Sequence, residues 1–265
     1  MTAASDFAER GFVHLPAFFN REGLEYLDNA EATIRDLYAM QARKCGYTGR
    51  WPELLDEMEA ADKEALYQVQ KMLPSSHVRR VVDLIGGGLL PYREEACGCE
   101  LIEGPGLFIN RPGTDRLLYR WHSEAHYYPK RRRFVNVWIP LFGDKTKANG
   151  AMSFKVGSHK RDFPFAEYQG YDRASLGRPN HFVQYEIPDS FLTEYEDHVC
   201  EAQRGDVILF DRALVHRSNR NTTDQYSFAL VARIWDASDD LTIAGDMAAK
   251  PYGGDIGRPG LIVRP

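Results

Sequence analysis

Three side chains in this sequence have the types and the spacing of ligands for a single metal ion. His122 and Glu124 are two residues apart, so on an extended strand both point to the same side. A distant histidine, His216, follows the apolar run 207–210. Two imidazoles and one carboxylate on one face of Fe(II) leave the opposite face open for a co-substrate and O₂. The pattern predicts a mononuclear iron site held by these three residues.

The elements that would position these ligands change in character along the chain. Apolar residues at three- and four-residue steps predict a helix over 21–43, and further helices over about 54–72 and near 76–85. From about residue 98, short apolar runs alternate with turn residues, which predicts a series of strands. The expected strands are 99–103, 106–111, 117–122, 134–141, 151–154, 183–187, 198–202, 206–210 and 226–235.

Many short strands after a helical block favour a mainly β fold with flanking helices, a cupin-like jelly roll with the N-terminal helices packed on one sheet. We expect a single domain over 1–265, because neither an internal repeat nor a second core is visible. Its expected parts are a mostly helical 1–97, a jelly-roll core at 98–236 with a lid insertion at about 160–198, and a C-terminal tail at 237–265.

Composition narrows the classes of partner. The chain is 43% hydrophobic, enough for a full core. A formal charge of −5 argues against a nucleic-acid or anionic-membrane partner. No apolar run could span a bilayer and no signal peptide is visible, so we expect a cytoplasmic protein. The spacing of the cysteines (Cys45, Cys97, Cys99 and Cys200) suits neither a redox pair nor a zinc site, which predicts free thiols.

Several segments occur in the order found in one enzyme family. They are Trp121-His122-Ser123-Glu124, Asn149-Gly150-Ala151-Met152, Gly157-Ser158-His159-Lys160, Gly205-Asp206-Val207-Ile208-Leu209-Phe210 and His216-Arg217-Ser218-Asn219-Arg220-Asn221. With these segments the sequence resembles the phytanoyl-CoA dioxygenase family of Fe(II)/2-oxoglutarate-dependent oxygenases. The resemblance implies a double-stranded β-helix, iron on the three predicted ligands, 2-oxoglutarate as co-substrate, and O₂ activation.

The resemblance also bears on the reaction. In the family, oxidative decarboxylation of 2-oxoglutarate supplies an oxidant that attacks an unactivated C–H bond. Hydroxylation, oxidative cyclisation and desaturation all use this oxidant. At the position of Glu124 many members have aspartate. With glutamate there, the sequence resembles members linked to bacterial surface-sugar, secondary-metabolite and antibiotic pathways. Halogenating members lack this carboxylate, so the resemblance argues against halogenation.

One position departs from the family pattern. The family places an arginine about eleven residues after the distal histidine, where it pairs with the far carboxylate of 2-oxoglutarate, and here that position is Ser227. Arg233 shares the predicted face of the strand but lies about 20 Å further along it. The anchor is therefore expected from another arginine, with Arg220 and Arg133 favoured. Other expected co-substrate residues are Ser218, Trp138 and Asn110.

The resemblance, together with the aromatic and acidic residues of the expected lid, suggests a class of small-molecule substrate. Tyrosine faces beside carboxylates suit the C–H faces and hydroxyls of sugars, which favours a sugar-containing natural product, an oligosaccharide or glycoside, or a surface-glycan precursor. The expected substrate residues are His126, Tyr127, Tyr128 and Tyr168. Two alternatives stay open: a non-catalytic ligand-binding protein on the same fold, and a cupin-like metal enzyme that does not use 2-oxoglutarate.

Overall fold

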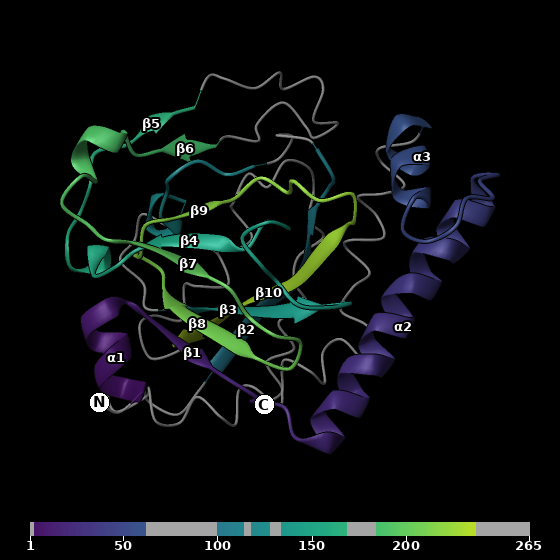
Figure 1. Ribbon diagram of the computed structural model, residues 1–265, viewed down its shortest axis with the longest axis horizontal. Helices are drawn as coiled ribbons and strands as arrows, with labels where there is room; N and C mark the ends of the chain where they lie inside the picture. The colour runs from purple at the N-terminus through teal and green to yellow at the C-terminus, as the bar shows by residue number, and fades with distance from the viewer. Residues whose placement is uncertain (1–2, 62–99, 114–117, 128–133, 169–183, 237–265) are drawn as a thin grey trace, which may run out of the picture.

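Two antiparallel sheets face each other at the centre of the molecule (Figure 1). The computed structural model describes residues 3–61, 100–113, 118–127, 134–168 and 184–236. One sheet has the strand order β1-β8-β3-β10-β2, and the second has the order β7-β4-β9. This arrangement confirms the predicted jelly roll.

The strands of the two sheets and the turns between them have the following bounds. The five-stranded sheet consists of β1 (Phe12–Leu15), β8 (Val207–Asp211), β3 (Phe134–Leu141), β10 (Ser227–Asp236) and β2 (Glu100–Asn110). The three-stranded sheet consists of β7 (Asp197–Cys200), β4 (Met152–Lys155) and β9 (His216–Ser218), and a separate hairpin joins β5 (Ala166–Glu167) to β6 (Tyr185–Glu186). Three 3₁₀ turns, η2 (Glu124–His126), η3 (Ser158–Lys160) and η5 (Asp189–Phe191), lie between strands.

Two strand predictions were wrong in detail. The expected strands 99–103 and 106–111 form one long strand, β2, with a register shift opposite Val231 and Arg233. The expected strand 117–122 does not form in its described part, where His122 alone makes a bridge, to His216. The predicted helix 76–85, the tail 237–265 and Cys97 and Cys99 lie outside the described residues.

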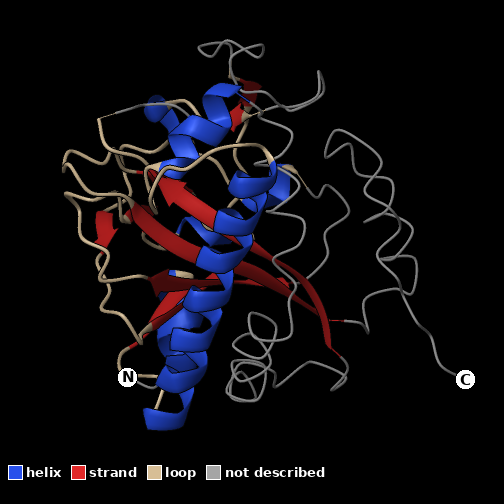
Figure 2. Cartoon of the chain, turned by 90° about the vertical axis from the view of Figure 1, so that its right-hand side faces the viewer, coloured by secondary structure: helices blue, strands red, loops and turns tan. Residues whose placement is uncertain are grey.

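Three helices are described: α1 (Ala3–Arg10), α2 (Arg21–Lys44) and α3 (Leu54–Ala61). The long helix α2 confirms the prediction for 21–43 and lies across the outer face of the five-stranded sheet (Figure 2). The side chain of Asn20 caps it by accepting a hydrogen bond from the backbone N–H of Gly23 at 2.9 Å. No helix in the described ranges has both the length and the apolarity that crossing a membrane requires.

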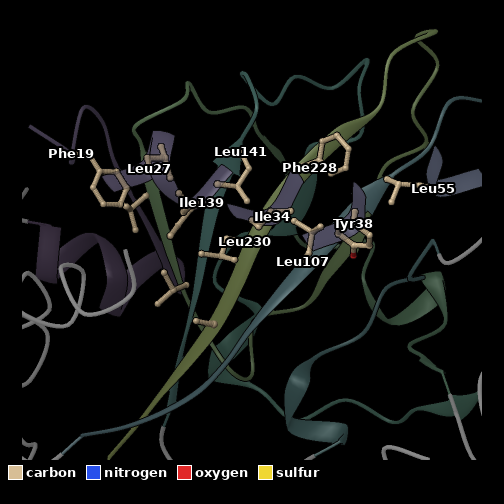
Figure 3. Packing of buried hydrophobic residues seen from close by; sticks show 14 of the residues in the cluster. Phe19, Leu27, Ile34, Tyr38, Leu55, Leu107, Ile139, Leu141, Phe228 and Leu230 are labelled. Carbon is tan, nitrogen blue, oxygen red and sulfur yellow. The ribbon is translucent and has the colours of Figure 1, made fainter. Parts of the chain in front are cut away.

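The interface between α2 and the sheet is the larger part of the core (Figure 3). Leu27, Ile34 and Tyr38 of α2 are fully buried against strand residues such as Ile139 and Leu230. Burying each aliphatic side chain of this kind contributes about 1.5–3 kcal/mol. The alternation of apolar residues along β3 and β10 puts one set of side chains against α2 and the other set between the sheets.

The space between the two sheets holds a second core cluster, which supports the candidate site. Phe12, Trp138 and Ile208 from the larger sheet pack there against Met152 and Phe154 from the smaller one. A short N-terminal strand therefore belongs to the jelly roll, because Phe12 on β1 pairs with β8.

Buried polar contacts fix the N-terminal part of the chain to this core. Asp206, before β8, accepts hydrogen bonds from His14 at 2.7 Å and from the backbone N–H of Ala17 at 2.8 Å. Arg204 donates from Nε to Glu31 of α2 at 2.9 Å, so the helix is linked to the loop that precedes β8.

Two described cysteines, Cys45 and Cys200, are free thiols, as expected.

Candidate metal centre

The three predicted ligands converge. One side-chain donor atom from each of His122, Glu124 and His216 lies within 4.8 Å of the others. Oε1 of Glu124 is 3.8 Å from Nε2 of His122 and 3.9 Å from Nε2 of His216. Two nitrogens and one oxygen at this separation can occupy one face of a divalent ion of the first transition row.

Backbone pairing brings the distant histidines together. The N–H of His122 donates to the carbonyl of His216 at 3.0 Å, and the reverse bond measures 2.8 Å. Glu124 opens the 3₁₀ turn η2, so the strand alternation from which the His122–Glu124 pair was predicted is not what aligns the two side chains. The turn instead folds the carboxylate back toward both imidazoles.

Backbone carbonyls fix the orientation of both imidazoles. Nδ1 of His122 lies 2.7 Å from the carbonyl oxygen of Arg120, and Nδ1 of His216 lies 2.9 Å from that of Leu214. A carbonyl can only accept, so each Nδ1 carries the hydrogen and each Nε2 presents a lone pair. Hydrogen bonds of this kind orient metal-binding histidines in proteins.

The ionisation of the site suits metal binding. Burial lowers the pKa of His216 to about 3, with a further contribution from His122, so this imidazole is neutral near pH 7. Burial would raise the pKa of Glu124, but the positive charge of Arg233 and the two histidines together hold it well below its usual range. His216 and Glu124 are therefore in the forms that bind a metal, a neutral imidazole and an ionised carboxylate.

Arg233 is the neighbour of this site that the sequence did not reveal. Its Nη2 donates to Oε2 of Glu124 at 2.7 Å, which leaves Oε1 directed at the histidines. Strand alternation correctly put Arg233 on the inner face of β10, but it gave no information on the partner. The contact depends on the turn at Glu124, which no local pattern predicted.

The structure brings together two of the expected co-substrate residues, since Asn110 and Trp138 both lie beside Lys145. Asn110 and Trp138 are buried in the interior, and Ser218 lies on β9, paired with Met152. Arg220 is exposed and donates to the carbonyl of Gly113 at 2.8 Å. Arg133 lies outside the described residues.

A buried lysine stands beside Asn110 and Ser227. Nζ of Lys145 lies 2.7 Å from Oδ1 of Asn110 and 2.5 Å from Oγ of Ser227. Its surroundings in the sequence, Asp144 to Lys147, are polar and predict an exposed turn. Sequence reasoning therefore missed it, because only the tertiary fold turns this side chain inward.

Aromatic side chains line the approach to His122. The ring of Tyr127 lies 5.9 Å from that of His122 and 5.1 Å from that of Tyr185 on β6 (centroid distances). His126 stacks on Phe165, with ring centroids 4.0 Å apart. These contacts form an aromatic cluster of His126, Tyr127, Phe165 and Tyr185.

Two further expected substrate residues can be located only in part. Tyr168, after β5, accepts a hydrogen bond from Arg120 at 3.0 Å, and the Arg120 guanidinium also lies over its ring. Tyr128 lies outside the described residues. Phe165 was not among the expected substrate residues, although it is 47% exposed and its ring stacks on His126.

Comparison with known proteins agrees with the geometry. The family model described as phytanoyl-CoA dioxygenase matches residues 7–228. The chain is also 25% identical over 147 residues to the peroxisomal phytanoyl-CoA dioxygenase of Mus musculus; this match covers 54% of the chain and 41% of the relative's length.

Solved structures share the fold at low sequence identity. A non-haem monooxygenase, ThoJ, has a TM-score of 0.57 and 18% identity over 89% of this chain and 77% of its own. EvdO2 from Micromonospora carbonacea var. aurantiaca, solved with 2-oxoglutarate, has a TM-score of 0.55 and 19% identity over 89% of this chain and 90% of its own. EctD from S. alaskensis, solved with 2-oxoglutarate and 5-hydroxyectoine, has a TM-score of 0.54 and 18% identity over 90% of this chain and 77% of its own.

Proposed function

The chain belongs to the phytanoyl-CoA dioxygenase family of Fe(II)/2-oxoglutarate-dependent oxygenases, and we propose that it oxidises an unactivated C–H bond of a small metabolite. The observation that carries this proposal is the convergence of His122, Glu124 and His216 within 4.8 Å. Fe(II), 2-oxoglutarate and O₂ bound there would supply the oxidising chemistry.

The residues of the chain prepare this site without the need for large rearrangement. The Nδ1 hydrogen bonds of both histidines keep Nε2 free for the metal. Arg233 holds the outer oxygen of Glu124, so the carboxylate presents one oxygen. Three protein ligands leave the remaining coordination positions for the two oxygens of a 2-oxo acid and for O₂.

We assign the substrate to sugar-containing natural products or surface-glycan precursors, with hydroxylation or oxidative ring closure as the outcome. The aromatic cluster beside His122 supports this assignment, because flat rings pack on the C–H faces of sugars. Glu186, on the same hairpin as Tyr185, supplies a carboxylate of the kind that binds sugar hydroxyls.

An anaerobic titration tests the reaction class. Apoprotein is titrated with Fe(II) and then with 2-oxoglutarate, while the visible charge-transfer band of the chelated metal is followed. We expect the band in the wild type and its loss in His122→Ala. Iron binding without a band would instead favour a cupin-like metal enzyme that does not use 2-oxoglutarate, and absence of iron binding would favour a non-catalytic ligand-binding protein.

A substrate screen tests the finer assignment. Protein loaded with Fe(II) is incubated with 2-oxoglutarate, O₂ and a panel of glycosides, amino acids and acyl thioesters, and succinate formation is measured. We expect glycosides to stimulate succinate formation most. In the product mass, gain of one oxygen atom indicates hydroxylation, and loss of two hydrogens indicates ring closure or desaturation. Stimulation by acyl thioesters alone would contradict the sugar assignment.

A further inference from the structure

A second buried charge lies in the interior, on Lys145. The side chain is 1% exposed, and its backbone exchanges hydrogen bonds with Ala202, so the residue is fixed to the sheet region. Its ammonium donates to Oδ1 of Asn110 at 2.7 Å and to Oγ of Ser227 at 2.5 Å. Nζ also lies 5.8 Å from the centroid of the Trp138 ring. Every one of these partners is neutral.

The Lys145 ammonium has no charged partner in the part of the chain that the structure describes. Within the described ranges no carboxylate lies within 4.0 Å of the Lys145 ammonium. Nδ2 of Asn110 is also buried and has no hydrogen-bond acceptor there. Burying a cation without a counter-charge is costly, and burial lowers the pKa of Lys145 to about 7. Nδ2 of Asn110 and the third N–H of the ammonium are donors on adjacent buried side chains without an acceptor among the described residues, which fits a carboxylate ligand.

The row of side chains along β10 connects the Lys145 cluster with the metal centre. Ser227, Ala229, Val231 and Arg233 share one face of the strand, with Ser227 at the lysine and Arg233 at Glu124. The first two side chains of the row are small. Ser227 stands at the position where the family pattern places an arginine, and the Lys145 ammonium lies beside it.

Residues of the smaller sheet show how the metal centre and the Lys145 cluster are placed relative to each other. On β4 and β9, Phe154 pairs with His216 and Met152 pairs with Ser218. Two residues before Met152, Gly150 lies so close to Asn110 that an added Cβ would come within 2.7 Å of its side chain. From Phe154 to Met152, β4 advances about 7 Å, and Gly150 lies just before the start of the strand. The Lys145 cluster is therefore a short distance along β4 from the metal centre, and a five-carbon diacid chelated by the metal at one end can bridge such a distance.

We propose that Lys145, with Asn110 and Ser227, binds the far carboxylate of 2-oxoglutarate. The inference rests on the proposed function, since it concerns the co-substrate of the same site. The family pattern has an arginine on β10 at the position of Ser227. In this chain the positive charge comes instead from Lys145, in the link that follows β3. The Asn110 amide and the Ser227 hydroxyl can each donate a further hydrogen bond to the carboxylate.

The test compares two ligands that differ only at the far end. 2-Oxopentanoate has the carbon chain and the chelating atoms of 2-oxoglutarate but a methyl group in place of the far carboxylate. Each ligand is titrated anaerobically into the Fe(II)-loaded protein, and the half-saturation concentration of the charge-transfer band is measured. We expect the wild type to prefer 2-oxoglutarate by about 10- to 100-fold, the effect of a charge-assisted contact.

The decisive variant is Lys145→Met, which keeps the side-chain length without the charge. We expect its half-saturation concentration for 2-oxoglutarate to rise by about 10- to 100-fold, to that of 2-oxopentanoate, whose own value stays unchanged. Lys147→Met is the matched control, because Lys147 is exposed in the same link. It should retain the wild-type preference.

The outcomes separate the two proposals. A wild type that forms no band with either ligand refutes the proposed function and this inference with it. A wild type that forms the band, together with a Lys145→Met variant that still prefers 2-oxoglutarate, refutes only the role of Lys145. If Lys145→Met does not fold, Asn110→Asp tests the same contact, because it leaves the lysine in place and occupies the ammonium.

Discussion

Two charged sites along the inner face of β10 are arranged in opposite ways. At the metal centre, Glu124 is paired with Arg233 at 2.7 Å. At the other end of the same row on β10, the ammonium of Lys145 has only neutral partners, Asn110 and Ser227. One end holds a completed ion pair, and the other holds a cation without its anion among the described residues.

The two ionisable groups respond to these arrangements in different ways. Both are buried, and burial disfavours the charged form of each. The partner of Glu124 outweighs this effect and keeps its pKa well below the usual range. Lys145 has no such partner, and its pKa falls to about 7. The metal end is therefore organised before any ligand arrives, whereas we infer that the lysine end is completed by the co-substrate.

The largest expected effect comes from removing the ligand at the organised end. In Glu124→Ala we expect loss of Fe(II) binding, loss of the charge-transfer band and loss of turnover. Changes to residues that only orient metal ligands weaken binding by about 10- to 100-fold, and loss of a ligand should exceed that. Fe(II) binding is measured by anaerobic titration. The control is Glu194→Ala, which removes an exposed carboxylate that pairs with Arg161; unchanged iron affinity in Glu124→Ala would exclude the assigned ligand set.

Asn110→Asp would give Lys145 a charged partner, as Glu124 has in Arg233. Its new carboxylate would stand at the position of Oδ1, 2.7 Å from the ammonium, and would supply the missing counter-charge. We expect the half-saturation concentration for 2-oxoglutarate to rise by about 10- to 100-fold, since the ligand then meets a paired cation and a second negative charge. Binding of 2-oxopentanoate should not change. Equal affinity for 2-oxoglutarate in the variant and the wild type would show that the far carboxylate binds elsewhere.

Arg233→Gln changes the organised end without removing a metal ligand. The outer oxygen of Glu124 loses its charged partner, so the carboxylate is less firmly oriented and more readily protonated. We expect an Fe(II) affinity about 10-fold lower, at the weaker end of the range for residues that hold a metal ligand in place. Arg161→Gln, which breaks an exposed ion pair with Glu194, is the matched control. A variant that binds iron as the wild type does would show that Arg233 does not position the carboxylate.

The same comparison shows what the sequence could predict. The jelly roll and helix α2 could be predicted from the spacing of apolar residues, because this spacing is a property of the local sequence. The three predicted ligands do converge, but for Glu124 the predicted strand geometry was wrong, because the turn that positions it depends on contacts with the distant His216 segment.

The charged neighbours of the site were harder to predict. Arg233 was considered only as a carboxylate anchor, and its pairing with Glu124 requires the register of β10 against β2, which carries a shift at this residue. Lys145 lies in a polar link that resembles a surface turn. Its burial arises from the packing of this link against β2 and β10, and neither periodicity nor composition records such a contact.

The last expected effect concerns the stability of the protein without ligands. In the unfolded chain the pKa of a lysine is about 10.4, and in the folded protein burial lowers that of Lys145 to about 7. Below pH 7 both states carry the proton, so the folded state bears the full cost of the buried charge. Between pH 7 and pH 10 the unfolded state binds more protons, so the cost diminishes as pH rises.

We therefore expect Lys145→Met to be more stable than the wild type by a few kcal/mol near pH 6 and by progressively less toward pH 10. Chemical unfolding of both proteins across this pH range, without metal or 2-oxo acid, measures the difference. Lys147→Met supplies the background, because its exposed side chain has no buried charge to relieve. A difference that stays constant with pH would mean that Lys145 keeps its proton throughout and has a counter-charge of its own, so that the two ends of the interior would be alike.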